Sequence, residues 1–355
     1  MGRQAREKRE RRARGESGSA RPVPPPTWSE RARAWLWGPQ PVVRLVAVRI
    51  LVPLAILGFM SARLVHADHW IGRSGFHVPE ISGDDYRQPL YVPALPNGLA
   101  WTIAVMTFAS GLAVAAGAFT RASSIVFATL LVFLALADRL AAFTVSKLGA
   151  VLAIAIACTP AAARVSVDAW RRHRREPRTP LPTEVSGGNV RFFQLLLAVM
   201  YFSTGVGKAR GDWLNRNDAI YSNLHDSYQT AISFLMASRI PGWGWAGFQW
   251  LVLTLELGAP LWFALRPTRL PAVALLLGMH AVIGLGFGPV IWFAILMASL
   301  LIACFTPRNW LERALGLRGP LDRVGPDGLR SAGPVAAGPV AAGPVAGVAG
   351  GSRIK

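Results

Sequence analysis

Long apolar runs separated by short polar segments fill the chain between about residues 42 and 306. A run of about 20 apolar residues can cross the hydrocarbon core of a bilayer as an α-helix. The pattern predicts six such spans, at 42–65, 98–120, 122–143, 148–163, 190–207 and 242–265. Residues 270–306 contain no Asp, Glu, Lys or Arg and would be about 55 Å long as one helix, so we expect them to fold back into two more spans. Gly284, Gly286, Gly288 and Pro289 supply the predicted turn.

The arginines predict how these spans are oriented. Six arginines lie in one segment between Arg164 and Arg178. The segment 66–97, in contrast, contains four acidic residues and two arginines. Basic loops stay in the cytoplasm. With about eight spans, every basic loop falls on one side, and both termini are inside. The predicted fold class is therefore all-α: a polytopic integral membrane helical bundle, N-in and C-in, in the cell membrane.

The two ends of the chain differ from the apolar region. Residues 1–41 are basic and rich in Pro, Gly and Ser, which predicts a disordered cytoplasmic arm. Residues 307–355 turn polar and then repeat Gly-Pro-Val-Ala-Ala, which is typical of a low-complexity cytoplasmic tail. The sequence thus divides into an arm (1–41), a transmembrane domain (42–306) and a tail (307–355).

The amino-acid composition also indicates a membrane protein. Hydrophobic residues make up 52% of the 355 residues and charged residues only 16%, against about 25% in soluble domains. The net charge of +19 would suggest nucleic acid in a soluble protein, but here the arginines flank apolar runs, so we expect membrane lipids and no nucleic acid as partners. Cys158 and Cys304 lie within apolar runs and are interpreted as buried hydrophobic residues rather than a disulfide.

Three ionisable residues stand out because charges at membrane depth are costly and usually functional. Lys208 follows the fifth span, and a helical stripe of small and polar residues, including Tyr201, leads to it. Glu256 and His280 lie in the middle of later spans. A desolvated lysine can act as a base or nucleophile.

Each of these residues also has a structural interpretation. Lys208 could be a lysine that extends from a helix end to the membrane surface. Glu256 could be half of an ion pair that locks two helices together, and His280 could be a core histidine with a hydrogen-bond partner. No metal-ligand spacing, phosphate-binding loop or serine-hydrolase motif occurs, so no metal site is predicted.

The segment Tyr201-Phe-x-x-Gly-Val-x-Lys208-x-x-x-Asp-Trp213 resembles the signature of the HTTM (horizontally transferred transmembrane domain) family, which is related to the membrane domain of vitamin K-dependent gamma-carboxylase. Further pieces resemble that family in the same order: Ser166-Val-Asp168, Leu255-Glu-Leu-Gly-Ala-Pro260, and Met279-His280 followed by Phe287, Phe293 and Met297. Together the resemblance covers roughly residues 40–306.

The resemblance implies chemistry that the residues alone do not. In the carboxylase, the lysine of this motif is the base that deprotonates vitamin K hydroquinone, so the role would fall to Lys208, with a lipid quinone or hydroquinone as cofactor. A secreted peptide or a quinone would be the substrate. One departure is that Thr144-Val-Ser-Lys147 stands where the family has an Asn-His pair. Another is that only the low-complexity tail follows residue 306, so propeptide-directed glutamate carboxylation is not expected.

Three function classes follow from these observations. The leading hypothesis is a multi-pass HTTM-type membrane enzyme with Lys208 as catalytic base and with Tyr201, Glu256 and His280 lining its binding site. The second is a non-catalytic membrane scaffold or partner protein in which Lys208 and Glu256 simply pair. A transporter is the weakest of the three, because no inverted repeat is evident.

Overall fold

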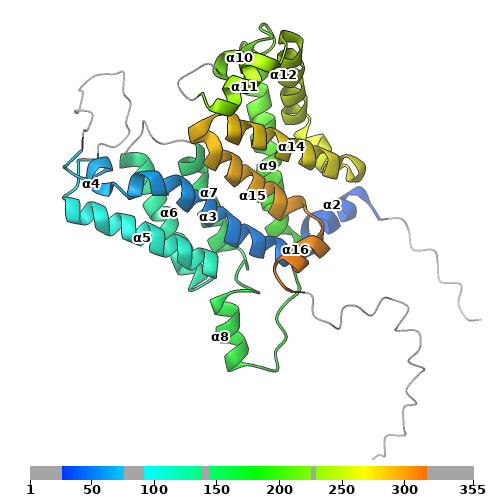
Figure 1. The fold of residues 1–355 in the computed structure, drawn as a ribbon. Helices are drawn as coiled ribbons and strands as arrows, with labels where there is room; N and C mark the ends of the chain where they lie inside the picture. Colours follow the sequence, from blue (N-terminus) through cyan, green and yellow to red (C-terminus); the bar gives the residue numbers. More distant parts are fainter. Residues whose placement is uncertain (1–25, 76–91, 138–143, 225–228, 318–355) are drawn as a thin grey trace, which may run out of the picture. The chain divides into compact units, whose positions relative to one another are not determined.

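The computed structural model describes residues 26–75, 92–137, 144–224 and 229–317, and these are mostly helical (Figure 1). The helices of the first part are α2 (Trp28–Trp37), α3 (Val43–Leu64), α4 (Ala67–Trp70), α5 (Asn97–Ala116), α6 (Thr120–Ala137), α7 (Thr144–Cys158), α8 (Val167–Arg175) and α9 (Gly187–Arg210). They are followed by α10 (Ala219–Leu224), α11 (Ala231–Arg239), α12 (Gly242–Leu257), α13 (Ala259–Ala264), α14 (Arg266–Gly286), η1 (Gly288–Val290), α15 (Ile291–Phe305) and α16 (Arg308–Ala314). Two short strands, β1 (Pro39–Pro41) and β2 (Glu184–Ser186), pair antiparallel.

Five helices are long and apolar enough to cross a membrane: α3, α5, α6, α9 and α14. A sixth span is reached if α15 and α16, which are bent by 117° at their junction, count as one. Helix α7 is apolar but only 15 residues long. The predicted sixth span, 242–265, is divided at Gly258 into α12 and α13. Among the described residues the structure thus gives five or six candidate spans, fewer than the eight predicted from the sequence.

Helix α3 is central to the bundle, because α5, α7 and α15 all pack against it. Val46, Val52, Ile56 and Met60 of α3 are at most 1% exposed. Pro53 lies inside this helix without ending it. In contrast, α5 and α6 have large apolar side chains exposed along one side, as expected of helices that face lipid.

Arg49 is a fully buried guanidinium in α3, and its hydrogen-bond acceptors among the described residues are backbone carbonyls. Its Nε donates to Ala161 O at 3.2 Å, and its other nitrogens donate to the carbonyls of Val114, Ala115 and Val165. These carbonyls lie at the ends of α5 and α7 and before α8. A buried charge costs several kcal/mol unless its hydrogen bonds are made. Arg49 therefore holds three segments to one end of α3.

Asp168 connects the start of α8 to the turn between α5 and α6. Its Oδ1 accepts a hydrogen bond from Phe119 N at 2.9 Å, and its Oδ2 accepts from Thr120 N and Thr120 Oγ1, both at 2.8 Å. Phe119 has a φ of 47°, in the left-handed region that costs a non-glycine residue free energy. The carboxylate thus stabilises a strained turn. Partial burial alone would raise its pKa, but these hydrogen bonds hold the pKa of Asp168 below its usual value.

The apolar run at 270–306 folds back where the sequence predicted. Helix α14 ends at Gly286, the 3₁₀ turn η1 follows, and α15 returns to pack on α14. The helices approach closely at Gly284, where an added Cβ would lie 3.1 Å from that of Ala294. Small residues are what close helix packing in membranes requires.

The predicted arm, 1–41, is partly ordered, which differs from the sequence expectation. Thr27 and Glu30 form a capping box that starts α2: Thr27 N donates to Glu30 Oε2 at 2.7 Å, and Glu30 N to Thr27 Oγ1 at 3.3 Å. The spacing Thr-x-x-Glu is a known start signal that composition obscured here. Strand β1 then pairs with β2, so folded structure begins before residue 42. Residues 1–25 lie outside the described residues.

The last residues form a separate unit, Glu312–Lys355. Its described part, 312–317, closes a helix end: Leu317 N donates to Glu312 O at 2.8 Å, and Gly316 has a φ of 65°. This is the left-handed C-terminal cap that glycine favours. The repeat in the predicted tail lies outside the described residues.

We expect Asp168→Asn to lower the free energy of unfolding by about 1 kcal/mol at neutral pH, because an amide cannot accept all three hydrogen bonds and solvent screens part of the loss. A depressed folded-state pKa stabilises the fold above the unfolded value of about 4, and this contribution is lost as pH falls through the folded-state pKa. The difference in unfolding temperature between wild type and variant, measured in detergent, should therefore shrink below about pH 4. Asp212→Asn is the matched control. Equal effects of the two substitutions at all pH values would contradict this role.

Candidate functional site

The buried face of α9 carries the candidate lysine. Gln194, Ala198, Tyr201 and Gly205 are buried along one stripe of this helix, and Lys208 continues it near the C-terminal end. The Lys208 side chain is 22% exposed, so it lies at the edge of the packed region and not in open solvent. Helix α9 ends two residues later, where Gly211 N donates to Gly207 O and Lys208 O.

Lys208 Nζ contacts Glu256 Oε1 at 2.5 Å. Glu256 comes from α12, and its side chain is only 5% exposed. Gly205 makes this approach feasible, because an added Cβ there would lie 2.8 Å from Leu257 N and 3.1 Å from Glu256 Cβ. The structure thus brings together two of the residues singled out in the sequence, as an interhelical pair.

Tyr201 and His280 form a second pair. Tyr201 Oη lies 2.7 Å from His280 Nε2, and either ring nitrogen of the histidine can carry the proton. Both side chains are buried, Tyr201 at 3% and His280 at 2% exposed. The rings of Phe263 and Phe293 lie edge-on to Tyr201 and His280, with centroid distances of 6.1 Å and 5.7 Å.

The two pairs are neighbours but not one hydrogen-bonded cluster. Lys208 is seven positions after Tyr201 in α9, which is about 10 Å along the helix axis. The two pairs are still close enough to interact electrostatically, Lys208 with His280 and Glu256 with Tyr201. No hydrogen bond joins them within the described part of the chain. Glu256 and His280 therefore lie beside different levels of α9, and of the two only Glu256 contacts Lys208.

Two polar atoms of these pairs have no hydrogen-bond partner. Glu256 Oε2 and His280 Nδ1 are both buried, and neither has an acceptor or donor among the described residues. An unsatisfied buried polar atom costs about 1–3 kcal/mol. Such atoms in a native structure are typical of sites that bind or exchange protons.

The loop after α9 covers the exposed side of Lys208. The Trp213 ring lies 4.7 Å from Lys208 Nζ, a cation–π contact. Gln249, which is 1% exposed in α12, holds this loop: its Nε2 donates to Trp213 O at 2.6 Å and also to Arg216 O, and its Oε1 accepts from Ala219 N. This role of Gln249 was not predicted from the sequence. The available signal was a polar residue in an apolar run, two helical turns before Glu256.

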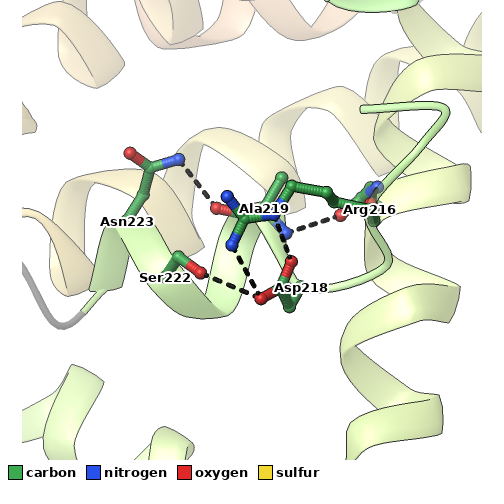
Figure 2. A network of polar contacts seen from close by, with 6 residues as sticks. Arg216, Asp218, Ala219, Ser222 and Asn223 are labelled. Carbon is green, nitrogen blue, oxygen red and sulfur yellow. Dashed lines mark hydrogen bonds and ion pairs between the residues drawn. The ribbon is translucent and has the colours of Figure 1, made fainter. Parts of the chain in front are cut away.

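The end of the loop is fixed by a polar network (Figure 2). Arg216 donates twice to the Asp218 carboxylate, at 3.1 Å each, and Ser222 Oγ also contacts it. The hydrogen bond from Arg216 holds the pKa of Asp218 below its ordinary value. Asn223 Nδ2 donates to Ala219 O at 2.7 Å within α10. These contacts order the segment that follows the lysine motif.

The remaining predicted features lie elsewhere. Ser166 caps α8, accepting from Ala169 N at 2.8 Å, so with Asp168 it has a structural position at the α5–α6 turn. A cavity of about 680 Å³ opens beside that turn, lined by Phe119, Thr120, Arg172 and neighbouring residues, not by Lys208. Cys158 and Cys304 are free thiols; Cys304 is buried as predicted, but Cys158, the last residue of α7, is exposed, which corrects the prediction that both are buried. Within the described ranges no three His, Cys, Asp or Glu side chains gather as a metal site.

Comparison with known proteins gives one match. The sequence pattern that defines the HTTM domain matches residues 41–310, which includes both pairs and the loop over Lys208. No curated protein and no solved structure matches the chain. The family match and the apolar helices identify a membrane protein. Since the match covers most of the chain, the protein belongs to the HTTM family.

Proposed function

We propose that this protein is a multi-pass membrane enzyme in which Lys208 acts as a base toward a weakly acidic, lipid-soluble substrate of the hydroquinone class. The observation that carries the proposal is the Lys208–Glu256 contact of 2.5 Å, in which the second carboxylate oxygen is buried without a partner. A pair that only locked two helices would be expected to satisfy both oxygens.

The pair can exchange a proton internally. If the ammonium of Lys208 passes a proton to Glu256 Oε1, a neutral amine and a neutral carboxylic acid result. Compared with water, a low-dielectric site favours this neutral pair over the charged pair. The amine lone pair can then accept the proton of a substrate O–H, giving back the ammonium and an aryloxide anion. That anion would be stabilised by the ammonium beside it. Dioxygen is the proposed oxidant: it takes two electrons from the deprotonated hydroquinone, which becomes the quinone, and leaves with the two released protons as hydrogen peroxide.

Tyr201 and His280 are proposed to bind the substrate. Their hydroxyl and imidazole lie among aromatic rings, including Phe263 and Phe293. Such buried surroundings suit a flat aromatic ring with a polar edge. His280 Nδ1 is the unpartnered atom that could meet a substrate oxygen. A lipid quinone would be the corresponding product.

A non-catalytic scaffold is the alternative, and the tight packing around the pair favours it. The close approach of α9 and α12 at Gly205 and the short Lys208–Glu256 contact would both serve an interhelical lock. In that case only the presence of opposite charges matters, and not which helix carries the amine.

For the topology we propose eight crossings with both termini in the cytoplasm of the cell. The five or six candidate spans become eight if α7, α15 and the divided pair α12–α13 each cross the bilayer. The arginine-rich helix α8 would then lie inside and the loop after Lys208 outside, as the positive-inside rule requires.

Lys208→Ala should reduce oxygen-dependent consumption of a lipid naphthohydroquinone by at least about 100-fold, since general-base catalysis contributes that much or more. The protein would be purified in nanodiscs, and co-purified quinone would be measured by mass spectrometry. Lys147→Ala, at an exposed lysine of α7, is the matched control. Unchanged consumption, at equal abundance and unfolding temperature, would exclude Lys208 as the base.

The charge-swapped variant Lys208→Glu/Glu256→Lys separates catalysis from scaffolding. The swap restores opposite charges between α9 and α12, so it should recover the unfolding temperature lost in either single variant but not the hydroquinone activity. Thermal unfolding and turnover would be measured on the same preparations. Full recovery of all function in the double variant would favour the scaffold instead.

Single cysteines test the topology in a background with Cys158 and Cys304 replaced by alanine. We expect a cysteine at Asp212 to react with a membrane-impermeant maleimide added to intact cells, because that loop would face outward. A cysteine at Arg175 in α8 should react only after the membrane is permeabilised. Labelling of both positions from the same side would overturn the eight-crossing arrangement.

A further inference from the structure

We propose that Arg44, Arg191 and Arg269 together bind a phosphate group, that of an anionic phospholipid headgroup, at a site separate from Lys208. The three arginines occupy corresponding places in three different helices. Arg44 is the second residue of α3, Arg191 the fifth of α9 and Arg269 the fourth of α14. All three side chains are partly exposed, so a ligand can reach them.

A chain of contacts brings the three guanidinium groups together. Arg44 and Gln194 both donate to Cys304 O, and Arg191 donates to Gln194 Oε1 at 2.6 Å. Arg269 donates to Phe263 O at 2.8 Å. The Phe263 ring stacks on that of Phe305, with centroids 4.4 Å apart, next to Cys304. Arg269 also interacts electrostatically with both other arginines.

The described residues supply no counter-charge to the cluster. Every acceptor named above is a neutral carbonyl or amide oxygen, and none of the three arginines forms an ion pair with a carboxylate in the part of the chain that the structure describes. In addition, Arg44 Nε is buried without a hydrogen-bond partner. Three neighbouring positive charges repel one another strongly away from bulk water. A bound anion would remove that repulsion.

The helix dipoles add to the positive potential. Because Arg44 and Arg269 lie in the first turns of α3 and α14, and Arg191 at the start of the second turn of α9, the positive ends of three long helices lie near the cluster. Arginine is the side chain best suited to phosphate, since its planar fork donates two parallel hydrogen bonds.

The surroundings favour a lipid as the source of the phosphate. Arg191 lies over the Trp35 ring at 4.5 Å and donates to Trp35 O, which connects the cluster to α2. Helix α2 exposes three tryptophans: Trp28, Trp35 and Trp37. Exposed tryptophans are enriched at the headgroup level of a bilayer, and basic sites between helices at that level bind anionic headgroups.

A purely structural role would be capping of helix ends. Arg44 donates to the end of α15, and Arg269 donates to Phe263 O and Ala264 O at the end of α13. Such caps stabilise a helix end, but one cation per end is sufficient. Capping does not account for Arg191, nor for Arg44 Nε, which is buried without a partner among the described residues.

The test uses the full-length protein in neutral detergent and titrates phosphatidylglycerol, phosphatidylcholine or inorganic phosphate. Native mass spectrometry would count bound lipid, and unfolding temperature would report stabilisation. We expect phosphatidylglycerol to bind about tenfold more tightly than phosphatidylcholine, and Arg269→Gln to remove that preference, since a charged hydrogen bond is worth roughly one factor of ten or more. Arg269→Lys, which keeps the charge, should retain most of it.

Arg121→Gln is the matched control, because it removes the same charge from an exposed position at the start of α6. Stabilisation by inorganic phosphate alone, lost in Arg269→Gln, would support the site but assign it to a soluble phosphate ester. The proposal is overturned if phosphatidylglycerol and phosphatidylcholine bind equally, or if Arg269→Gln and Arg121→Gln weaken binding by the same factor. If Arg269→Gln unfolds, Arg191→Gln serves the same comparison.

Discussion

The need to neutralise charge within an apolar helical bundle governs this structure, and the contact between Lys208 and Glu256 is its central case. Neither charge could remain alone in this position, because Glu256 is almost completely buried. Their contact fixes α9 against α12, and the glycine at position 205 removes the side chain that would keep the helices apart. The loop over the lysine, held by Gln249, depends on the same two helices.

Arginine meets the same constraint in a different way at the other ends of the helices. Arg49 is satisfied by four carbonyls, so its charge is spread over neutral dipoles. Arg44, Arg191 and Arg269 also use carbonyl and amide oxygens, but they stand together. Among the described residues, a carboxylate accompanies Lys208 but not the three arginines, and this difference separates the proposed proton-exchanging site from the proposed anion-binding site.

Much of the fold was predictable, because an apolar run of given length leaves few structural choices. The bounds of α3 to within one residue, those of α9 to within three, the uncharged helix α5 and the reversal between α14 and α15 all follow from hydropathy, glycine and proline. Helix α2 was missed, since the basic composition of 1–41 obscured its capping box. The break at Gly258 was also missed, although Pro260 lies two residues later.

For the site, the sequence by itself determined which residues were costly enough to need an explanation: Lys208, Glu256 and His280 are ionisable groups in apolar runs. Only the tertiary structure decided their partners, pairing Glu256 with the lysine and His280 with Tyr201. It also gathered three arginines, Arg44, Arg191 and Arg269, of which the first and last are 225 positions apart in sequence. The reason is physical: hydropathy is a local property of the chain, whereas the partner of a buried charge depends on which helices pack together.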